Sequence, residues 1–160
     1  MKKIMFLVVF MSLLVGLVGC GKAEKTFTGA GVTITLTEAF VEKEVVQAPL
    51  YLESPTQMFM ALRETKSSLA GYGISTLDDY IEAVLNNHGK NSTVKSKEEG
   101  DLVYKYAYYE SEVNDQTFGY MLLTFEGKDH FYSMNFGCLA NKLEDFKEKF
   151  FDYAKTIKVE

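Results

Sequence analysis

Four alternating segments in the second half of the chain constrain its fold more than any other feature. They cover residues 92–97, 102–110, 117–125 and 130–138, and short polar turns such as Glu98-Glu99-Gly100-Asp101 join them. Apolar and polar side chains alternate along much of these segments, which is the period-two pattern of β-strands. Neighbouring strands joined by such short turns pair antiparallel. The pattern therefore predicts an antiparallel meander.

The first half of the chain predicts three further strands, at residues 32–36, 50–52 and 57–63. In the first of these, apolar side chains alternate with threonines, as in a half-buried strand. The second lies between two prolines, which favours a sheet edge. In the third, Met58, Met60 and Leu62 share one face, which we expect to be the apolar one. Residues 64–75 hold three serines and two glycines and predict a long loop.

Two helices complete the pattern. One is predicted at residues 76–87, with Ser75 or Thr76 as the capping residue and Asp78 and Asp79 in the first turn. The second begins near Asn141, which has Glu144 in capping-box spacing. Both show apolar side chains at helical spacing. Together with the strands, they predict an α+β domain in which about six antiparallel strands form a sheet and two main helices pack on it.

This order of elements resembles the PsbP-like fold group, which includes small bacterial lipoproteins of the DcrB type. The features that carry the resemblance are the early strand at 32–36, the helix at 76–87, the hairpins, and the run Phe131-Tyr132-Ser133-Met134-Asn135-Phe136 leading into the last helix. The resemblance implies an α/β/α sandwich over residues 30–160. It also implies an accessory or binding protein, because the group has no common catalytic residues.

The N-terminus has the pattern of an export signal. Lys2 and Lys3 precede a stretch without charges that extends from Ile4 to Gly21, as expected of a signal helix. At its end, Leu17-Val18-Gly19-Cys20 resembles the lipobox of bacterial prolipoproteins. The resemblance implies cleavage before Cys20 and a diacylglycerol on its thiol. An uncut membrane span and ordinary secretory cleavage are the alternatives, and neither explains a cysteine at this position.

These patterns divide the chain into a lipoprotein signal peptide at residues 1–19, a lipidated cysteine with its tether at residues 20–29, and a single α+β domain at residues 30–160. We expect the protein at the extracytoplasmic face of the plasma membrane, attached through the lipid on Cys20. Without Lys2 and Lys3, the mature chain has 15 basic and 22 acidic residues, a net charge of −7. Such an acidic surface argues against nucleic acid as a partner.

The sequence gives no pattern typical of catalysis or of metal and cofactor binding. His88 and His130 are far apart and have no ligand spacing. Cys138 shares the apolar side of its strand, so we interpret it as a buried thiol and not a nucleophile. The acidic residues Glu110, Glu112 and Asp115 lack the spacing of a calcium loop. We therefore expect no enzyme, no cofactor and no metal.

Tyrosines provide the most distinctive candidate for binding. Tyr104, Tyr106 and Tyr108 share one face of a predicted strand, and Tyr72 lies in the loop at 64–75. Ordinary packing under a helix explains the three strand tyrosines; a binding face for a ligand or partner is the alternative. The sequence favours a non-enzymatic accessory protein that binds an envelope protein. The alternative function is a carrier that holds a small ligand in an aromatic cavity between sheet and helix.

Overall fold

The computed structural model describes residues 23–160. The predicted signal peptide and Cys20 lie outside these residues. Seven strands form the main sheet in the order β3-β4-β5-β9-β8-β7-β6, and three form a small sheet in the order β1-β2-β10. The strands are β1 (Glu24–Gly29), β2 (Val32–Thr37), β3 (Val41–Glu42), β4 (Leu50–Glu53), β5 (Met58–Thr65), β6 (Lys95–Glu99), β7 (Leu102–Val113), β8 (Gln116–Glu126), β9 (His130–Leu139) and β10 (Lys158–Val159). Three α-helices accompany them: α1 (Lys66–Ala70), α2 (Leu77–Asn87) and α3 (Leu143–Ala154).

The predicted meander is confirmed: β6, β7, β8 and β9 follow one another as antiparallel neighbours. The long hairpin of β7 and β8 turns at Asn114 and Asp115, whose φ angles are 51° and 61°. Positive φ at both central residues matches the twist of the flanking strands, and asparagine and aspartate tolerate this conformation better than most residues. This turn chemistry fixes the register of the hairpin.

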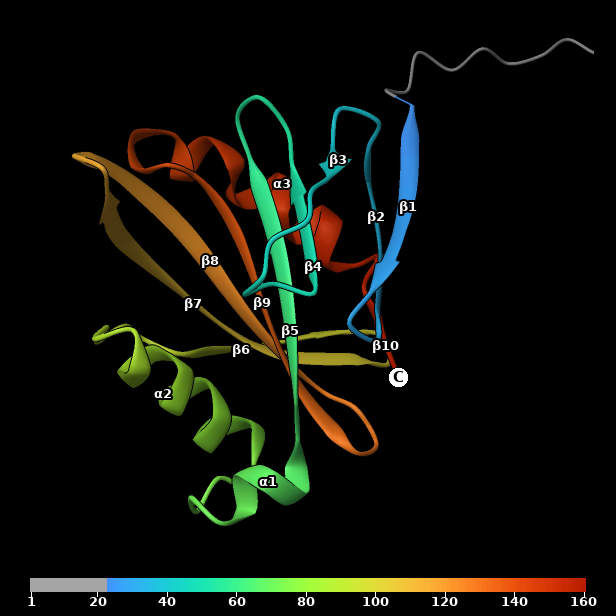
Figure 1. The fold of residues 1–160 in the computed structure, drawn as a ribbon, viewed down its shortest axis with the longest axis vertical. Helices are drawn as coiled ribbons and strands as arrows, with labels where there is room; N and C mark the ends of the chain where they lie inside the picture. Colours follow the sequence, from blue (N-terminus) through green and yellow to red (C-terminus); the bar gives the residue numbers. More distant parts are fainter. Residues whose placement is uncertain (1–22) are drawn as a thin grey trace, which may run out of the picture.

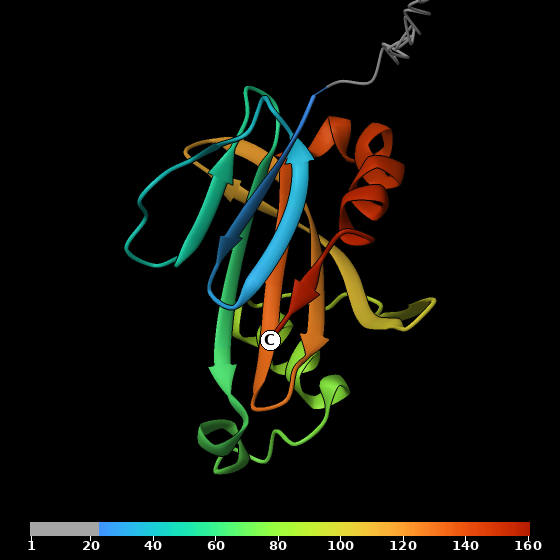
Figure 2. The same ribbon diagram turned by 90° about the vertical axis from the view of Figure 1, so that its right-hand side faces the viewer.

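The main sheet is covered differently on its two faces (Figures 1 and 2). One face, the α3 face, packs against α3 and the small sheet, and it contains most of the core. Its largest fully buried side chains include Phe59, Phe125, Phe136 and Phe150. The other face, the α2 face, packs against α2 and α1 through two smaller clusters of buried residues. The α+β fold class with helices on both sides of an antiparallel sheet is therefore confirmed.

Helix α2 begins as the sequence predicts. Thr76 is its N-cap: the Thr76 hydroxyl accepts a hydrogen bond from the Asp79 amide at 3.1 Å, and Asp79 accepts one from the Thr76 amide at 2.9 Å. This reciprocal capping box satisfies two amides that a helix leaves without partners at its first turn. The predicted capping residue of the last helix is wrong, because a short 3₁₀ turn, η1 (Ala140–Lys142), precedes α3 and Asn141 lies within it.

The small sheet joins distant parts of the chain. Strand β2 pairs with β1 on one side and with β10 on the other. The Thr35 amide donates to the hydroxyl of Thr156, 121 residues away, at 3.0 Å. The Tyr132 hydroxyl donates to the Glu160 carbonyl at 3.0 Å, and the Glu160 amide donates to the Gly31 carbonyl at 3.1 Å. These bonds fasten β10 to both sheets.

Three local predictions are corrected by the structure. The tether prediction fails for residues 24–29, which form β1: Phe27 is buried in the core, and the threonines beside it pair with those of β2. The loop prediction for 64–75 misses α1, whose Leu69 packs against Tyr80 and Phe131. The early strand at 32–36 belongs to the small sheet, while β3 and β4 extend the main sheet, which therefore has seven strands.

Met58, Met60 and Leu62 share one side of β5, as predicted, but this side is not the one that faces the main core. Phe59 and Ala61 are fully buried, whereas Met58, Met60 and Leu62 are half-buried. Both sides of this strand are largely apolar, so alternation alone does not identify the core side. The register decides it, because Phe59 pairs with Phe136 under α3 and Met58 pairs with Gly137 on the α2 face.

Candidate functional site

Helix α2 covers only part of its face of the main sheet; most side chains on the rest are apolar, and Glu53, Ser111 and Gln116 are polar ones among them. One row of directly paired residues crosses the sheet in this uncovered part: Val41, Glu53, Met58, Gly137, Tyr120 and Tyr109. Directly paired residues of antiparallel strands point to the same side. The same register places Tyr51, Met60, Phe118, Val113 and Leu139 on this side. We call the two sets together the open face.

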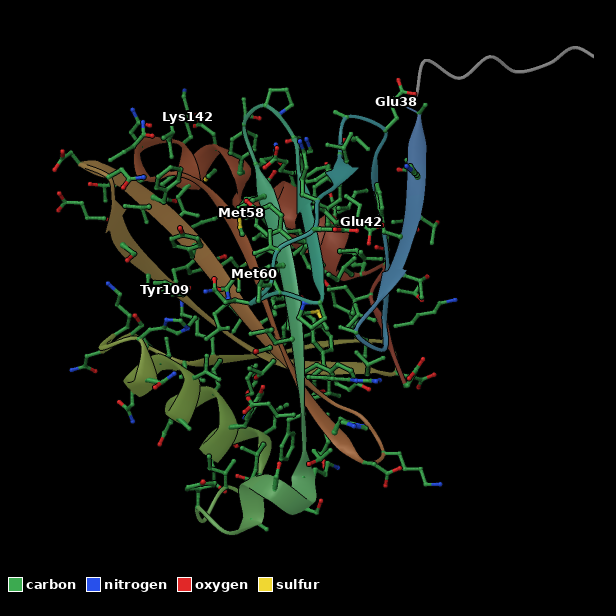
Figure 3. All side chains as sticks on the ribbon, in the orientation of Figure 1. Glu38, Glu42, Met58, Met60, Tyr109 and Lys142 are labelled. Carbon is green, nitrogen blue, oxygen red and sulfur yellow. The ribbon has the colours of Figure 1, made fainter. Side chains whose placement is uncertain are left out.

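Three of these residues are far more exposed than is usual for large apolar side chains within strands. Val41, Val113 and Leu139 are 48%, 45% and 37% exposed. Figure 3 shows Met58 and Met60 on the part of the sheet above α2, where no helix lies over them, and Tyr109 beside the end of α2. Exposed apolar side chains that gather on one face of a sheet are candidates for a site of interaction. Sequence reasoning missed the open face because its residues come from six strands that only the pairing register brings together.

Tyr109 marks the boundary between the covered and the uncovered part. Its hydroxyl donates to Asn135 Oδ1 at 2.9 Å, and its ring stacks on that of Tyr120 with 5.0 Å between centroids. On its other side lies the end of α2, with the His88 ring 6.1 Å away. Burial raises the pKa of Tyr109 well above its ordinary value, so the phenol stays protonated and acts as a hydrogen-bond donor at neutral pH.

Gly137 allows two side chains to lie across the sheet. A Cβ atom at this position would lie 2.8 Å from Met58 Sδ and 2.9 Å from Tyr120 Cε1. Glycine therefore leaves room for both side chains over β9. The sequence gives no signal for this role, because a single glycine inside a strand has several explanations.

A groove of about 520 Å³ opens at the rim of the open face. It lies between the turn of residues 54–57, which joins β4 and β5, and the beginning of α3. Its apolar lining comes from Tyr51, Pro55, Met58, Phe118, Leu139 and Phe146. Glu53, Gln57, Gln116 and Lys142 are polar residues that also line it. We call this hollow the rim groove; its volume is within the range of small-molecule sites, roughly 300–1,000 Å³.

A second hollow of about 310 Å³ lies on the other side of the same turn. Thr37, Glu38, Phe40 and Lys149 contribute to its lining, and residues 54–57 line both hollows. Within this turn, Gln57 is only 6% exposed, and its Oε1 has no hydrogen-bond partner among the described residues. A buried amide oxygen without a partner is unfavourable, so this side chain is a polar group that a ligand can satisfy.

The predicted tyrosine face does not form one surface. Tyr104 is fully buried and stacks on Phe125, while Tyr106 and Tyr108 are half-buried beside α3. The Tyr106 ring meets Phe151 edge-on, and Lys147 Nζ lies 4.4 Å from the centre of the Tyr108 ring. Burial raises the pKa of Tyr108 to about 12. These contacts correspond to the packing explanation for the strand tyrosines.

Tyr72 lies apart from the three strand tyrosines. It is 84% exposed and follows α1, which packs with the α2 side of the sheet. Tyr104, Tyr106 and Tyr108 belong to the opposite, α3 side. The structure therefore does not bring the four predicted tyrosines together.

The other candidates from the sequence are also separated. Cys138 is 3% exposed on the α3 face, which confirms that its thiol is buried, and burial raises its pKa to about 11. His88 is exposed at the end of α2, and His130 lies at the opposite end of β9 from Cys138. In the described part of the chain, His, Cys, Asp and Glu side chains do not gather in groups of three that could hold a metal ion. None of the helices in residues 23–160 is long and apolar enough to span a bilayer.

Comparison with known proteins identifies the fold. No protein-family model and no curated protein matches the sequence. Among solved structures, cyanobacterial PsbP (CyanoP) from Synechocystis sp. PCC 6803 is similar, with a TM-score of 0.62, 12% identity, and coverage of 92% of this chain and 99% of CyanoP. The yeast Ran-binding protein Mog1p is similar at a TM-score of 0.56 and 7% identity, with 87% and 96% of the two chains covered.

A protein from Bacteroides thetaiotaomicron is also similar, with a TM-score of 0.58 and 12% identity. The match covers 85% of this chain but 48% of the Bacteroides protein. All three similarities extend over most of the described domain. They confirm the PsbP-like fold that the order of elements predicts.

Proposed function

We propose that this protein is an accessory lipoprotein of the cell envelope that is not an enzyme and binds a partner protein through the open face. The observation that carries the proposal is the set of exposed apolar side chains on the uncovered part of the main sheet, with Val41, Val113 and Leu139 among them. Protein interfaces favour aromatic and methionine side chains at their centre, and the open face also holds Met58, Met60 and Tyr120.

The location in the proposal rests on the sequence. The charge-free stretch ending at Cys20 supports export and a lipid anchor on the outer face of the plasma membrane. The acidic mature chain supports a partner other than nucleic acid. The PsbP-like fold supports a binding role only as an analogy, since similar folds carry different functions.

In-cell crosslinking tests the proposed partner. A photoreactive amino acid replaces Met60, at the centre of the open face, and in a matched control it replaces Tyr72, which is 84% exposed beyond α1. We expect a recurrent envelope protein to be captured from position 60 and not from position 72. Capture of the same abundant proteins from both positions would contradict binding through the open face.

A small-ligand carrier is the second candidate, because the rim groove has the size of a ligand site. The groove lies at the rim of the α2 face and not beneath the strand tyrosines, so the expected place of the cavity changes. Native mass spectrometry of the purified protein tests this function: a bound small molecule of constant mass supports it, and a ligand-free protein argues against it.

A further inference from the structure

We infer that the rim groove binds one acyl chain of a phospholipid from the membrane to which the protein is anchored. The inference rests on the proposed attachment through Cys20. It adds a ligand of defined chemistry to the partner binding proposed for the open face.

The rim groove opens at the end of the domain where the described chain begins. The carbonyl of Ala23, the first described residue, accepts a hydrogen bond from the Glu38 amide at 2.8 Å. Glu38 lines the second hollow, which shares the turn of residues 54–57 with the rim groove. Figures 1 and 2 both show the beginning of β1 and the turn between β4 and β5 at the same end of the molecule. Lys142, at the groove, lies toward this end in Figure 3.

Only a short stretch of chain separates this end of the domain from the proposed anchor. Three peptide units separate Cys20 from Ala23, and even a fully extended chain of that length spans only about 10 Å. An anchored protein therefore keeps Ala23, and with it the end of the domain where the groove opens, close to the bilayer. A lipid acyl chain from that bilayer is then the apolar ligand nearest to the groove.

The lining of the rim groove is mainly apolar. Met58, Phe118 and Phe146 give the groove apolar walls, and methionine side chains adapt to flexible apolar ligands. Lys142 is the cation of the lining, and its ammonium group already pairs with Asp145 at 3.1 Å. Glu53 adds a negative charge. The lining therefore suits an uncharged hydrocarbon chain better than an anionic group.

The buried amide of Gln57 supplies the polar contact that such a ligand needs. The oxygen and the NH₂ group of the Gln57 amide are nearly equal in shape, so either can face a ligand. The NH₂ group can donate a hydrogen bond to the ester carbonyl at the beginning of an acyl chain. The apolar groove with the Gln57 amide at its wall thus matches the two parts of an esterified chain.

Photocrosslinking in vesicles tests the inference with the full lipidated protein. The protein is reconstituted in phosphatidylcholine vesicles that contain phosphatidylcholine with a diazirine near the end of one acyl chain. After irradiation, mass spectrometry locates the lipid adducts. We expect adducts at Met58, Phe118 or Phe146, in addition to adducts near Cys20 that report the anchor.

Two variants control for the site. Leu139→Glu places a charge in the groove at a position that is 37% exposed, so the fold is retained. We expect this variant to lower groove adducts at least tenfold relative to adducts near Cys20. Tyr72→Glu changes an exposed residue beyond α1 in the same way, and we expect it to leave both kinds of adduct unchanged.

The outcomes separate the two proposals. Adducts near Cys20 without adducts in the groove would overturn lipid binding and leave the anchor in place. A protein that does not attach to the vesicles, purified with an uncut N-terminus, would overturn the anchor and with it the lipid inference. Groove adducts that persist in Leu139→Glu, or crosslinks that place a second copy of the chain in the groove, would overturn specific lipid binding.

Discussion

The two faces of the main sheet are made of similar side chains but are covered to different extents. On the α3 face, Phe59, Phe136 and Phe150 are fully buried; the Phe136 ring stacks on Phe150 and meets the Phe59 ring at a tilted angle. On the α2 face, Phe131 is buried beneath α2 and α1, while Met58 and Tyr120 remain half-exposed. Composition does not explain this difference, since both sets are aromatic or aliphatic.

The difference follows from the lengths of the covering elements. An α-helix of 11 residues, such as α2, is about 16 Å long, whereas a strand of 11 residues, such as β8, extends about 37 Å. Helix α3 is nearly as short as α2, with 12 residues. However, the small sheet covers much of the rest of the α3 face. The α2 face has no such second layer among the described residues, so its far end stays open.

The largest expected effect separates the two faces by stability. Phe136→Ala removes a fully buried ring that contacts Phe59, Phe150 and Tyr153, and we expect it to lower the free energy of unfolding by about 3–5 kcal/mol. Met60→Ala removes a half-buried side chain of the open face, and we expect a loss of about 1 kcal/mol. Urea denaturation measures both. Equal losses would show that the open face is covered in solution.

A pair of glycines sharpens the same comparison. In Gly119→Ala, on the α3 face, the new Cβ would lie 3.0 Å from Leu143 Cβ and 3.3 Å from Ala140 Cα, which the chain holds in place. We expect a loss of about 1–3 kcal/mol from overpacking. In Gly137→Ala, the Cβ meets the ends of Met58 and Tyr120, which can move toward the open side, so we expect less than about 1 kcal/mol. Thermal or urea unfolding of the two variants would contradict this order if Gly137→Ala were the more damaging.

The capping box tests how well α2 holds its part of the face. Thr76→Ala removes the hydroxyl that caps the helix, and we expect a loss of about 1 kcal/mol. Hydrogen bonds from the Thr76 side chain and from the amides of Ser75 and Thr76 lower the pKa of Asp79. Because the folded pKa lies below the unfolded one, the stabilising contribution is present above pH about 4 and is lost as the pH falls through the folded value.

The same variant has a second readout. Without the Thr76 hydroxyl, the pKa of Asp79 should rise toward its ordinary value, which an NMR titration of the Asp79 carboxyl group measures. Leu77→Ala serves as a control in the same turn that leaves the hydrogen bonds to Asp79 in place. An unchanged Asp79 pKa in Thr76→Ala would contradict the capping box.

The thiol of Cys138 tests the boundary between the rim groove and the α3 face through its reaction rate, without a change in stability. Cys138 lines the rim groove but belongs to the α3 face, and burial raises its pKa to about 11. At pH 8 we expect the folded protein to react with a thiol reagent more slowly than the unfolded protein, on the order of a hundredfold, because the thiolate is the reactive form. Labelling at the same rate in both states would show that the groove exposes the thiol.

Local sequence patterns were sufficient for most of the fold. The alternating segments and short polar turns such as Glu98-Glu99-Gly100-Asp101 predicted the meander, and Thr76 as a possible cap predicted the start of α2. Strand β1 was missed because Phe27 is its single buried residue and gives no alternation. The division into two sheets depends on the pairing of β2 with β10, and local periodicity carries no information on pairing at that distance.

The open face could not be predicted in the same way. Its residues come from β3, β4, β5, β7, β8 and β9, so only the register brings them into one surface. The strand tyrosines were conspicuous in the sequence, but they lie beside α3. The residues of the rim groove, including Gln57 and Phe146, gave no signal of a ligand site in the sequence, because single polar and aromatic residues occur in any domain.

The bond between Thr35 and Thr156 bears on when the domain can fold. Strand β2 is synthesised early, yet it lacks one neighbour until residues 158–159 have emerged from the ribosome. Contacts between such distant residues form slowly, because a long loop must close first. The small sheet of a nascent chain therefore cannot be completed before residues 158–159 are available.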